Sequence, residues 1–135
     1  MVSDYKSIAS KIKFEGRAFI NGKYVDAIDG EKFENINPAN SETLCSVAKC
    51  NHKDVDLAVK VSRKAFTSGV WSKTSPEFRK DVLLKFAELL RKNGEENSVL
   101  ECVDTGKLIG DCLNEVANDA PMHFQWYGEL IDKVF

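Results

Sequence analysis

The sequence predicts an α+β fold in which short β segments come first and helices follow. Up to about residue 50, apolar residues occur in short β-prone runs separated by turn signals. After that point the apolar period changes from two residues to about 3.6, which is typical of amphipathic helices. Because no later strands follow for about four predicted helices to cover, we interpret the chain as part of a larger protein.

The β part begins with a predicted hairpin at residues 18–25. Asn21-Gly22 separates its two runs, and this pair tolerates the positive φ angles of a type I′ turn. Asp29-Gly30 marks a second turn, and the next run ends at Asn37-Pro38, because a proline favours extended backbone in the residue before it. Residues 43–48 form the last predicted strand. We expect only β structure and loop up to this point.

The first two helices are predicted from apolar periodicity and from end signals. One runs from about Lys53 to Ser68, with Asn51 as its candidate N-cap. The next begins at Ser75-Pro76, where a capping hydroxyl precedes a proline whose missing N–H costs nothing. We expect Asn93-Gly94 to end this helix with a left-handed residue.

The remaining two helices complete the chain. Glu95 and Glu96 place negative charge at the N-terminal end of the third helix, and Gly106 is expected to end it. The fourth runs from about Ile109 to the terminus and contains Pro121. Since proline removes one backbone donor, we expect a kink or break before it.

Composition and charge exclude several classes of protein. The 135 residues are 43% hydrophobic and 30% charged, as in an ordinary globular domain, and the formal charge is −2 with neither sign concentrated in a block. No apolar run approaches the roughly 18 residues that cross a bilayer. Residues 1–16 contain no continuous apolar stretch. We therefore expect a cytoplasmic protein with neither nucleic acid nor membrane as partner.

Thiols and imidazoles offer little chemistry in this sequence. The cysteines are Cys45, Cys50, Cys102 and Cys112. Their spacing does not fit CxxC chemistry, and we expect reduced thiols buried as small hydrophobic residues. A zinc site would need His52 or His123, of which we expect the first to be solvated and the second partly buried. Cys102 with His123 as nucleophile and base is the alternative, supported by no motif.

A series of short motifs occurs in order along the chain. They are Phe19-Ile-Asn-Gly22, Ile36-Asn-Pro38, Asp54-Val-Asp56, Ala65-Phe66, Trp71-Ser72, Ser75-Pro76 with Arg79, Asp104-Thr-Gly-Lys107 and Trp126-Tyr127. Each alone is weak, but the ordered set resembles the N-terminal quarter of the NAD(P)-dependent aldehyde dehydrogenases over nearly all of residues 17–135. Residues 71–76 and 126–134 look most like the branch that oxidises gamma-glutamyl-gamma-aminobutyraldehyde in putrescine breakdown.

This resemblance implies a division of the chain and a place in an enzyme. Residues 1–16 would be an N-terminal extension, and residues 17–135 an α+β fragment of an α/β protein, namely part of its cofactor-binding domain without the Rossmann-like sheet. The parent, expected to be a homo-oligomer, would oxidise an aldehyde to a carboxylate through a thiohemiacetal, with hydride transfer to NAD or NADP. In the family, the nucleophilic Cys, the general-base Glu, the oxyanion-hole Asn and the cofactor turn all lie beyond position 135.

We therefore expect no catalytic and no cofactor-binding residue in this chain. Alone, without the remainder of the aldehyde dehydrogenase polypeptide, it is expected to be inactive and to bind no nicotinamide cofactor, because the whole set of reacting groups is missing. The alternative function is a non-catalytic interaction module whose exposed helix faces bind a partner chain. Reading the coding sequence past position 135 would discriminate between these two hypotheses.

The resemblance also implies one metal site. In the family, a monovalent cation is held by two backbone carbonyls just before the Asn-Pro motif and by the Asp of the Asp-Thr-Gly motif. Here these residues are Asn35, Ile36 and Asp104. Such oxygen ligands suit hard cations, here K⁺ or Na⁺. The alternative is that Asp104 binds backbone N–H groups at the Thr105-Gly106 turn.

Four further residues in or next to the matched motifs bear on the expected geometry. Leu108 stands where the family usually has proline, which leaves open a different path after the third helix. Lys107 is expected to be a solvated charge favoured by the helix dipole, and Trp126-Tyr127 a packing pair.

Overall fold

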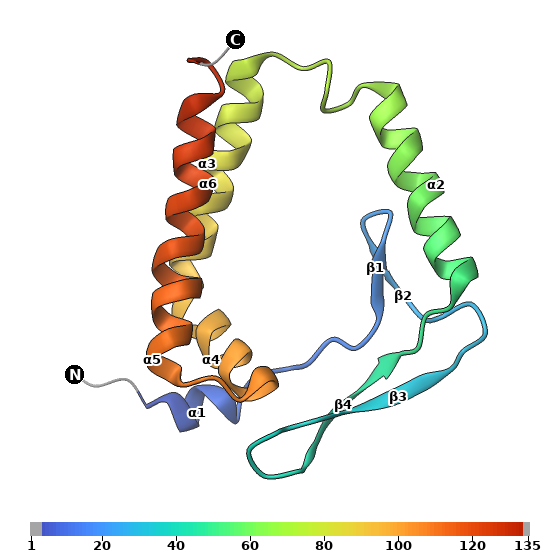
Figure 1. Cartoon of the computed structure of the whole chain (residues 1–135), viewed down its shortest axis with the longest axis vertical. Helices are drawn as coiled ribbons and strands as arrows, with labels where there is room; N and C mark the ends of the chain where they lie inside the picture. The colour runs from blue at the N-terminus through green and yellow to red at the C-terminus, as the bar shows by residue number, and fades with distance from the viewer. Residues whose placement is uncertain (1–3, 134–135) are drawn as a thin grey trace. The chain divides into compact units, whose positions relative to one another are not determined.

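The computed structural model describes residues 4–133, which form two compact units (Figure 1). One unit comprises Lys13–Lys73, and the other combines the described residues 4–12 and 74–133. In the first, Ala27 is a buried apolar residue, and in the second Val99 and Cys112 are buried. The α+β prediction is confirmed, because all described strands precede the long helices.

Every strand that the structure describes lies in the unit Lys13–Lys73. The strands are β1 (Ala18–Ile20), β2 (Lys23–Val25), β3 (Lys32–Ile36) and β4 (Thr43–Ala48). β1 pairs with β2 and β3 with β4, each time antiparallel. The predicted hairpin is confirmed, since Asn21 and Gly22 have φ angles of 55° and 74°, as a type I′ turn requires.

Helix α2 (His52–Ser68) follows β4 and begins at the predicted cap. The Asn51 side chain accepts a hydrogen bond from Lys53 N at 2.8 Å, and Asn51 N donates to Asp54 Oδ2 at 2.9 Å. This reciprocal arrangement satisfies backbone donors at the helix start. Gly69 ends the helix in the left-handed conformation, at a φ of 79°.

The second unit is helical throughout its described elements. These are α1 (Tyr5–Ala9), α3 (Pro76–Lys92), α4 (Gly94–Thr105), α5 (Ile109–Cys112), the π-helix η1 (Leu113–Asp119) and α6 (Ala120–Leu130). The expectation of only β structure and loop before residue 50 was wrong about α1, which packs on α4. Its start is capped by Asp4, which accepts from Ser7 N at 3.1 Å. A helix of five residues is too short to give an apolar period.

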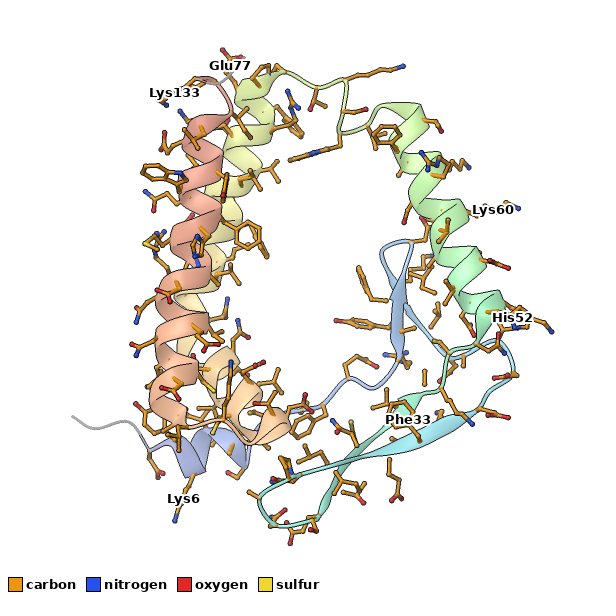
Figure 2. The ribbon with its side chains drawn as sticks, viewed as in Figure 1. Lys6, Phe33, His52, Lys60, Glu77 and Lys133 are labelled. Atoms are coloured by element: carbon orange, nitrogen blue, oxygen red, sulfur yellow. The ribbon has the colours of Figure 1, made fainter. Side chains whose placement is uncertain are left out.

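Helices α3 and α6 lie side by side and antiparallel (Figure 1). Glu77, in the first turn of α3, and Lys133, just after α6, are at the same end of the pair (Figure 2). Close approach is possible because Gly128 has no side chain: a Cβ there would lie 3.2 Å from Leu83 Cβ. Ala87 on α3 is buried.

Pro121 produces an irregular helix rather than a break. The seven residues of η1 directly precede α6, and their backbone has π-helical geometry. A π-turn moves hydrogen bonding to the i−5 carbonyl, so the chain passes the missing proline donor without stopping. The Asn118 side chain donates to the Leu113 carbonyl at 3.3 Å, within η1.

The expectation that Asn93-Gly94 supplies a left-handed helix end was wrong. Asn93 has a φ of −105°, and Gly94 is the first residue of α4, without a positive φ. The glycine is needed for space instead: a Cβ at Gly94 would lie 2.8 Å from Ala117 Cβ and 3.0 Å from Ala117 Cα. The sequence signal therefore marks a close approach between α4 and η1.

Candidate functional site

Two of the predicted cation ligands end strand β3. Asn35 pairs with Cys45 and Ile36 with Thr43, and the register shifts between these two pairs. Such a bulge redirects the backbone groups at this point of the ladder. Asn35 is half-buried, whereas Ile36 is exposed.

The third predicted ligand, Asp104, lies in the last turn of α4. Its side chain is exposed. The following turn is closed by Gly106, whose N–H donates to Cys102 O at 3.0 Å with a φ of 75°. Thr105 Oγ1 donates to Glu101 O at 2.7 Å and accepts from Lys107 N at 3.3 Å. Thr105 thus provides side-chain bonds at this turn.

The structure places Asn35 and Ile36 together in one unit and Asp104 in the other. The proposed donors are two carbonyl oxygens and a carboxylate, a set whose chemistry fits a hard monovalent cation. Among residues 4–133, no group of three or more His, Cys, Asp or Glu side chains is arranged to hold a metal ion. A zinc-type cluster is therefore absent from the described part of the chain.

The segment after α4 keeps the geometry that a proline would impose. Leu108 has φ −63° and ψ 135°, and the proline ring would hold φ near −65°. The departure from the family motif thus leaves the backbone path unchanged at this residue. Lys107 is exposed but pairs with Glu115, and this contact raises the pKa of the lysine. The expectation of a merely solvated charge was incomplete.

Asp54 is a buried charged residue that joins two segments of the first unit. It is 3% exposed, and one carboxylate oxygen accepts from Ile28 N at 2.9 Å while the other accepts from Asn51 N at 2.9 Å. Asn51 Nδ2 also donates to Asp29 Oδ2 at 2.6 Å. The pKa of Asp29 is lowered mainly by a hydrogen bond from the Glu31 N–H and further by this contact with Asn51. These bonds tie the turn after β2 to the start of α2.

The sequence analysis assigned the capping role of this motif but missed the contact to Ile28, which is 26 residues away. A groove of about 300 Å³ lies beside Asp54. Its apolar lining residues are Ile20, Val25, Ile28, Leu57 and Val61. Both carboxylate oxygens of Asp54 accept hydrogen bonds from backbone N–H groups, so we assign this residue a structural role.

The expected burial of the thiols holds for one cysteine. Cys112 is fully buried, Cys45 and Cys102 are half-buried, and Cys50 is exposed. Cys50 follows the end of β4, and its N–H donates to the Ala48 carbonyl at 3.1 Å. Cys102 Sγ donates to Lys107 O at 3.0 Å.

The expectation of a partly buried His123 was wrong, because the residue is exposed on α6. His52 is exposed in the first turn of α2, as expected (Figure 2). No hydrogen bond joins Cys102 to His123 in residues 4–133. The nucleophile–base alternative therefore has no geometric support.

Several helix faces carry exposed apolar side chains. Trp126 and Tyr127 are 64% and 63% exposed, so the expectation of a packing pair is not met in the described structure. On α3, an apolar groove of about 490 Å³ is lined by Phe78, Val82, Phe86 and Leu89, with Asp81 and Lys85. Phe86 makes an edge-to-face contact with Phe124 of α6, at 4.6 Å between ring centroids. No helix formed by residues 4–133 is both long and apolar enough to cross a bilayer.

Comparison with known proteins agrees with the class that the motifs and fold indicate. Residues 24–135 match the aldehyde dehydrogenase family, and the chain belongs to this family. It corresponds to the N-terminal part of such an enzyme.

The similar proteins include curated and structurally characterised dehydrogenases. Aldehyde dehydrogenase 1 of Tanacetum cinerariifolium is 51% identical over 102 residues, which cover 76% of this chain and 20% of the relative. An indole-3-acetaldehyde dehydrogenase of P. syringae, solved as a variant in complex with NAD⁺, is 42% identical in sequence, with a TM-score of 0.93. The match covers 98% of this chain and 27% of the P. syringae chain. The gamma-glutamyl-gamma-aminobutyraldehyde dehydrogenase of Burkholderia cenocepacia is 41% identical, with a TM-score of 0.93 over 97% of this chain and 27% of its own. The chain thus spans about a quarter of the length of these relatives.

Proposed function

We propose that this chain supplies the N-terminal part of an NAD(P)-dependent aldehyde dehydrogenase, which oxidises an aldehyde to a carboxylate. The observation that carries the proposal is the TM-score of 0.93 at 42% identity to a dehydrogenase solved with NAD⁺. When bound, the nicotinamide accepts the hydride. Residues 17–135 would be part of the cofactor-binding domain and residues 1–16 an extension to it.

An aminoaldehyde of the gamma-glutamyl-gamma-aminobutyraldehyde type is the proposed substrate of the complete enzyme. The supporting observations are the likeness to the Burkholderia cenocepacia enzyme and the sequence motifs at residues 71–76 and 126–134. A homo-oligomeric parent and a cytoplasmic location remain predictions from the sequence.

The contribution of this chain would be structural. Its helices carry apolar faces such as the α3 groove, and the hydrogen bonds of Asp54 and the ion pairs of Lys80 hold elements together. Lys80 pairs with Glu129 and Asp132, each at 3.1 Å, which joins the start of α3 to the end of α6. Catalysis and cofactor binding are assigned to the remainder of the polypeptide.

Complementation tests this proposal. The 135-residue chain is incubated with NAD⁺ and gamma-aminobutyraldehyde-type substrates, alone and after co-expression with a relative that lacks the matching quarter. We expect no NADH formation above a boiled control for the chain alone, and turnover in the co-expressed sample. Turnover by the chain alone that Cys102→Ala abolishes would overturn the assignment of catalysis to the remainder.

An interaction module is the second candidate function, and the exposed apolar faces of α2, α3 and α6 favour it. It predicts that the chain binds a complete aldehyde dehydrogenase without raising its activity. The dehydrogenase-part hypothesis predicts binding only to the truncated relative, with recovered turnover. The same co-expression experiment therefore separates the two.

The cation site is a further part of this proposal. Asn35 and Ile36 would supply carbonyl oxygens and Asp104 a carboxylate to K⁺ or Na⁺, as the donor chemistry favours. In the complemented enzyme, Asp104→Asn should lower K⁺ affinity at least several-fold, measured by titrating salt against unfolding temperature. Asp56→Asn, at an exposed position of α2, is the control and should leave the titration unchanged. An unchanged K⁺ titration in Asp104→Asn would exclude the site.

A further inference from the structure

Two cysteines lie on neighbouring helices of the same unit. Cys102 is on the third turn of α4, and Cys112 is the last residue of α5, which packs against α4. The three residues Gly106–Leu108 join these helices. Among the four thiols of the chain, this pair therefore belongs to two packed elements connected by a short loop.

Contacts from the Cys102 side of α4 reach the last residue of α5 and the loop that precedes it. Ser98, one helical turn before Cys102, has its hydroxyl 3.2 Å from the carbonyl oxygen of Cys112. Residues four apart on a helix have Cβ atoms about 5–6 Å apart, so Cys102 is a close neighbour of this contact. Cys102 Sγ donates to Lys107 O at 3.0 Å, in the loop that leads into α5.

The two thiols differ in exposure. Cys102 is half-buried and Cys112 is fully buried. Burial raises the pKa of the Cys112 thiol, and negative charge on Cys102 raises it further, a coupling that agrees with their closeness. A small oxidant from solution meets Cys102 first, and Cys112 is the resolving thiol.

We propose that Cys102 and Cys112 form an intramolecular disulfide when the chain meets a peroxide. Cys102 Sγ attacks one peroxide oxygen, the O–O bond breaks, and a sulfenic acid and one water result. Cys112 Sγ then attacks the Cys102 sulfur, the S–O bond breaks, and the oxygen leaves with the Cys112 proton as a second water. Two thiols are oxidised to one disulfide, and one hydrogen peroxide is reduced to two waters.

Closing this bond requires Cα atoms about 4.4–6.8 Å apart. Helix α5 can adjust to this requirement because it is four residues long, its N-terminus has no side-chain cap, and it continues directly into η1.

The other cysteines form a built-in control pair. Cys45 lies within β4, and the strand runs on to Ala48 before Cys50. At about 3.3 Å per residue, the strand alone extends about 10 Å beyond Cys45, which exceeds the reach of a disulfide. We expect no bond between Cys45 and Cys50.

Oxidation of the full 135-residue chain with hydrogen peroxide tests the proposal. In a Cys45→Ser/Cys50→Ser variant, we expect intact mass to fall by two hydrogen atoms and both remaining thiols to become unreactive to alkylation, reversibly with dithiothreitol. A Cys102→Ser/Cys112→Ser variant should lose no hydrogens. A Cys112→Ser variant should accumulate a sulfenic acid at Cys102 that dimedone traps.

Because Cys112 is buried, its replacement can unfold the chain, and peptide mapping of the oxidised native sequence provides an independent readout. A linked peptide containing Cys102 and Cys112 is expected there as the main disulfide species. Two free thiols at these positions after oxidation, or only disulfides between separate chains, would overturn the proposal.

Discussion

At the scale of single residues, buried hydrogen bonding to Asp54 stabilises the first unit. Replacing Asp54 with Ala removes the acceptor of the Ile28 and Asn51 N–H groups and leaves both donors unsatisfied. We expect a loss of about 2–4 kcal/mol, measured by urea unfolding followed by fluorescence. Asp56→Ala, at an exposed position of the same helix, should change stability by less than about 0.5 kcal/mol. Equal effects of the two substitutions would contradict this role.

A second prediction at this scale concerns the titration of Glu15. Hydrogen bonds from the Arg17 side chain and N–H lower the pKa of Glu15 from 4.5 to about 2. Because the folded pKa is lower than the unfolded one, the contact favours folding above about pH 4.5, and this contribution is lost as the pH falls through about 2. Carbon-detected NMR should report a Glu15 midpoint near 2. In Arg17→Gln the midpoint should return toward 4.5, and a native-like midpoint there would show that Arg17 is not the cause.

At the scale of elements, Gly94 of α4 lies in a tightly packed contact, whereas Gly110 of α5 has open space beside it. In Gly94→Ala the new Cβ would lie 2.8 Å from Ala117 Cβ, and its closest backbone neighbour is the Ala117 Cα. We expect a destabilisation of about 1–3 kcal/mol despite the better helix propensity of alanine. Gly110→Ala in α5 is the matched control, since no atom lies within 4 Å of the position that its new methyl group would take, and it should be neutral or stabilising by up to about 1 kcal/mol. The free energy of unfolding of both variants is measured by denaturant titration. An unchanged free energy of unfolding in Gly94→Ala would refute the close approach of α4 and η1.

At the scale of the whole molecule, exposed apolar side chains should make the isolated chain associate. The α3 groove of Phe78, Val82, Phe86 and Leu89 is one such surface. Patches of this kind favour burial against another surface, so we expect concentration-dependent association and binding of a hydrophobic dye.

Light scattering with multi-angle detection measures this association. A variant with Val82→Lys and Leu89→Lys should associate less, because both substitutions place charge on the apolar groove, whereas Lys60→Gln on α2 should behave like the native chain. A clean monomer that binds no dye would count against the prediction.

The sequence by itself determined the features that depend on contacts within a few residues. The Asn21-Gly22 turn, the Asn51 cap, the Ser75 cap and the Gly106 helix end were all predicted, because each is closed by bonds between residues close in sequence. The ordered motifs likewise indicated the family, which residues 24–135 confirm.

The tertiary structure alone decided features that depend on distant parts of the chain. Asp54 accepts a hydrogen bond from Ile28, Gly94 makes room for Ala117, and His123 is exposed on α6. Local periodicity determines none of these three features. The predicted cation ligands depend on two separate units, so their sequence order specifies donor chemistry but not assembly. Local hydrogen bonds specify elements, whereas packing specifies which side chains those elements bury.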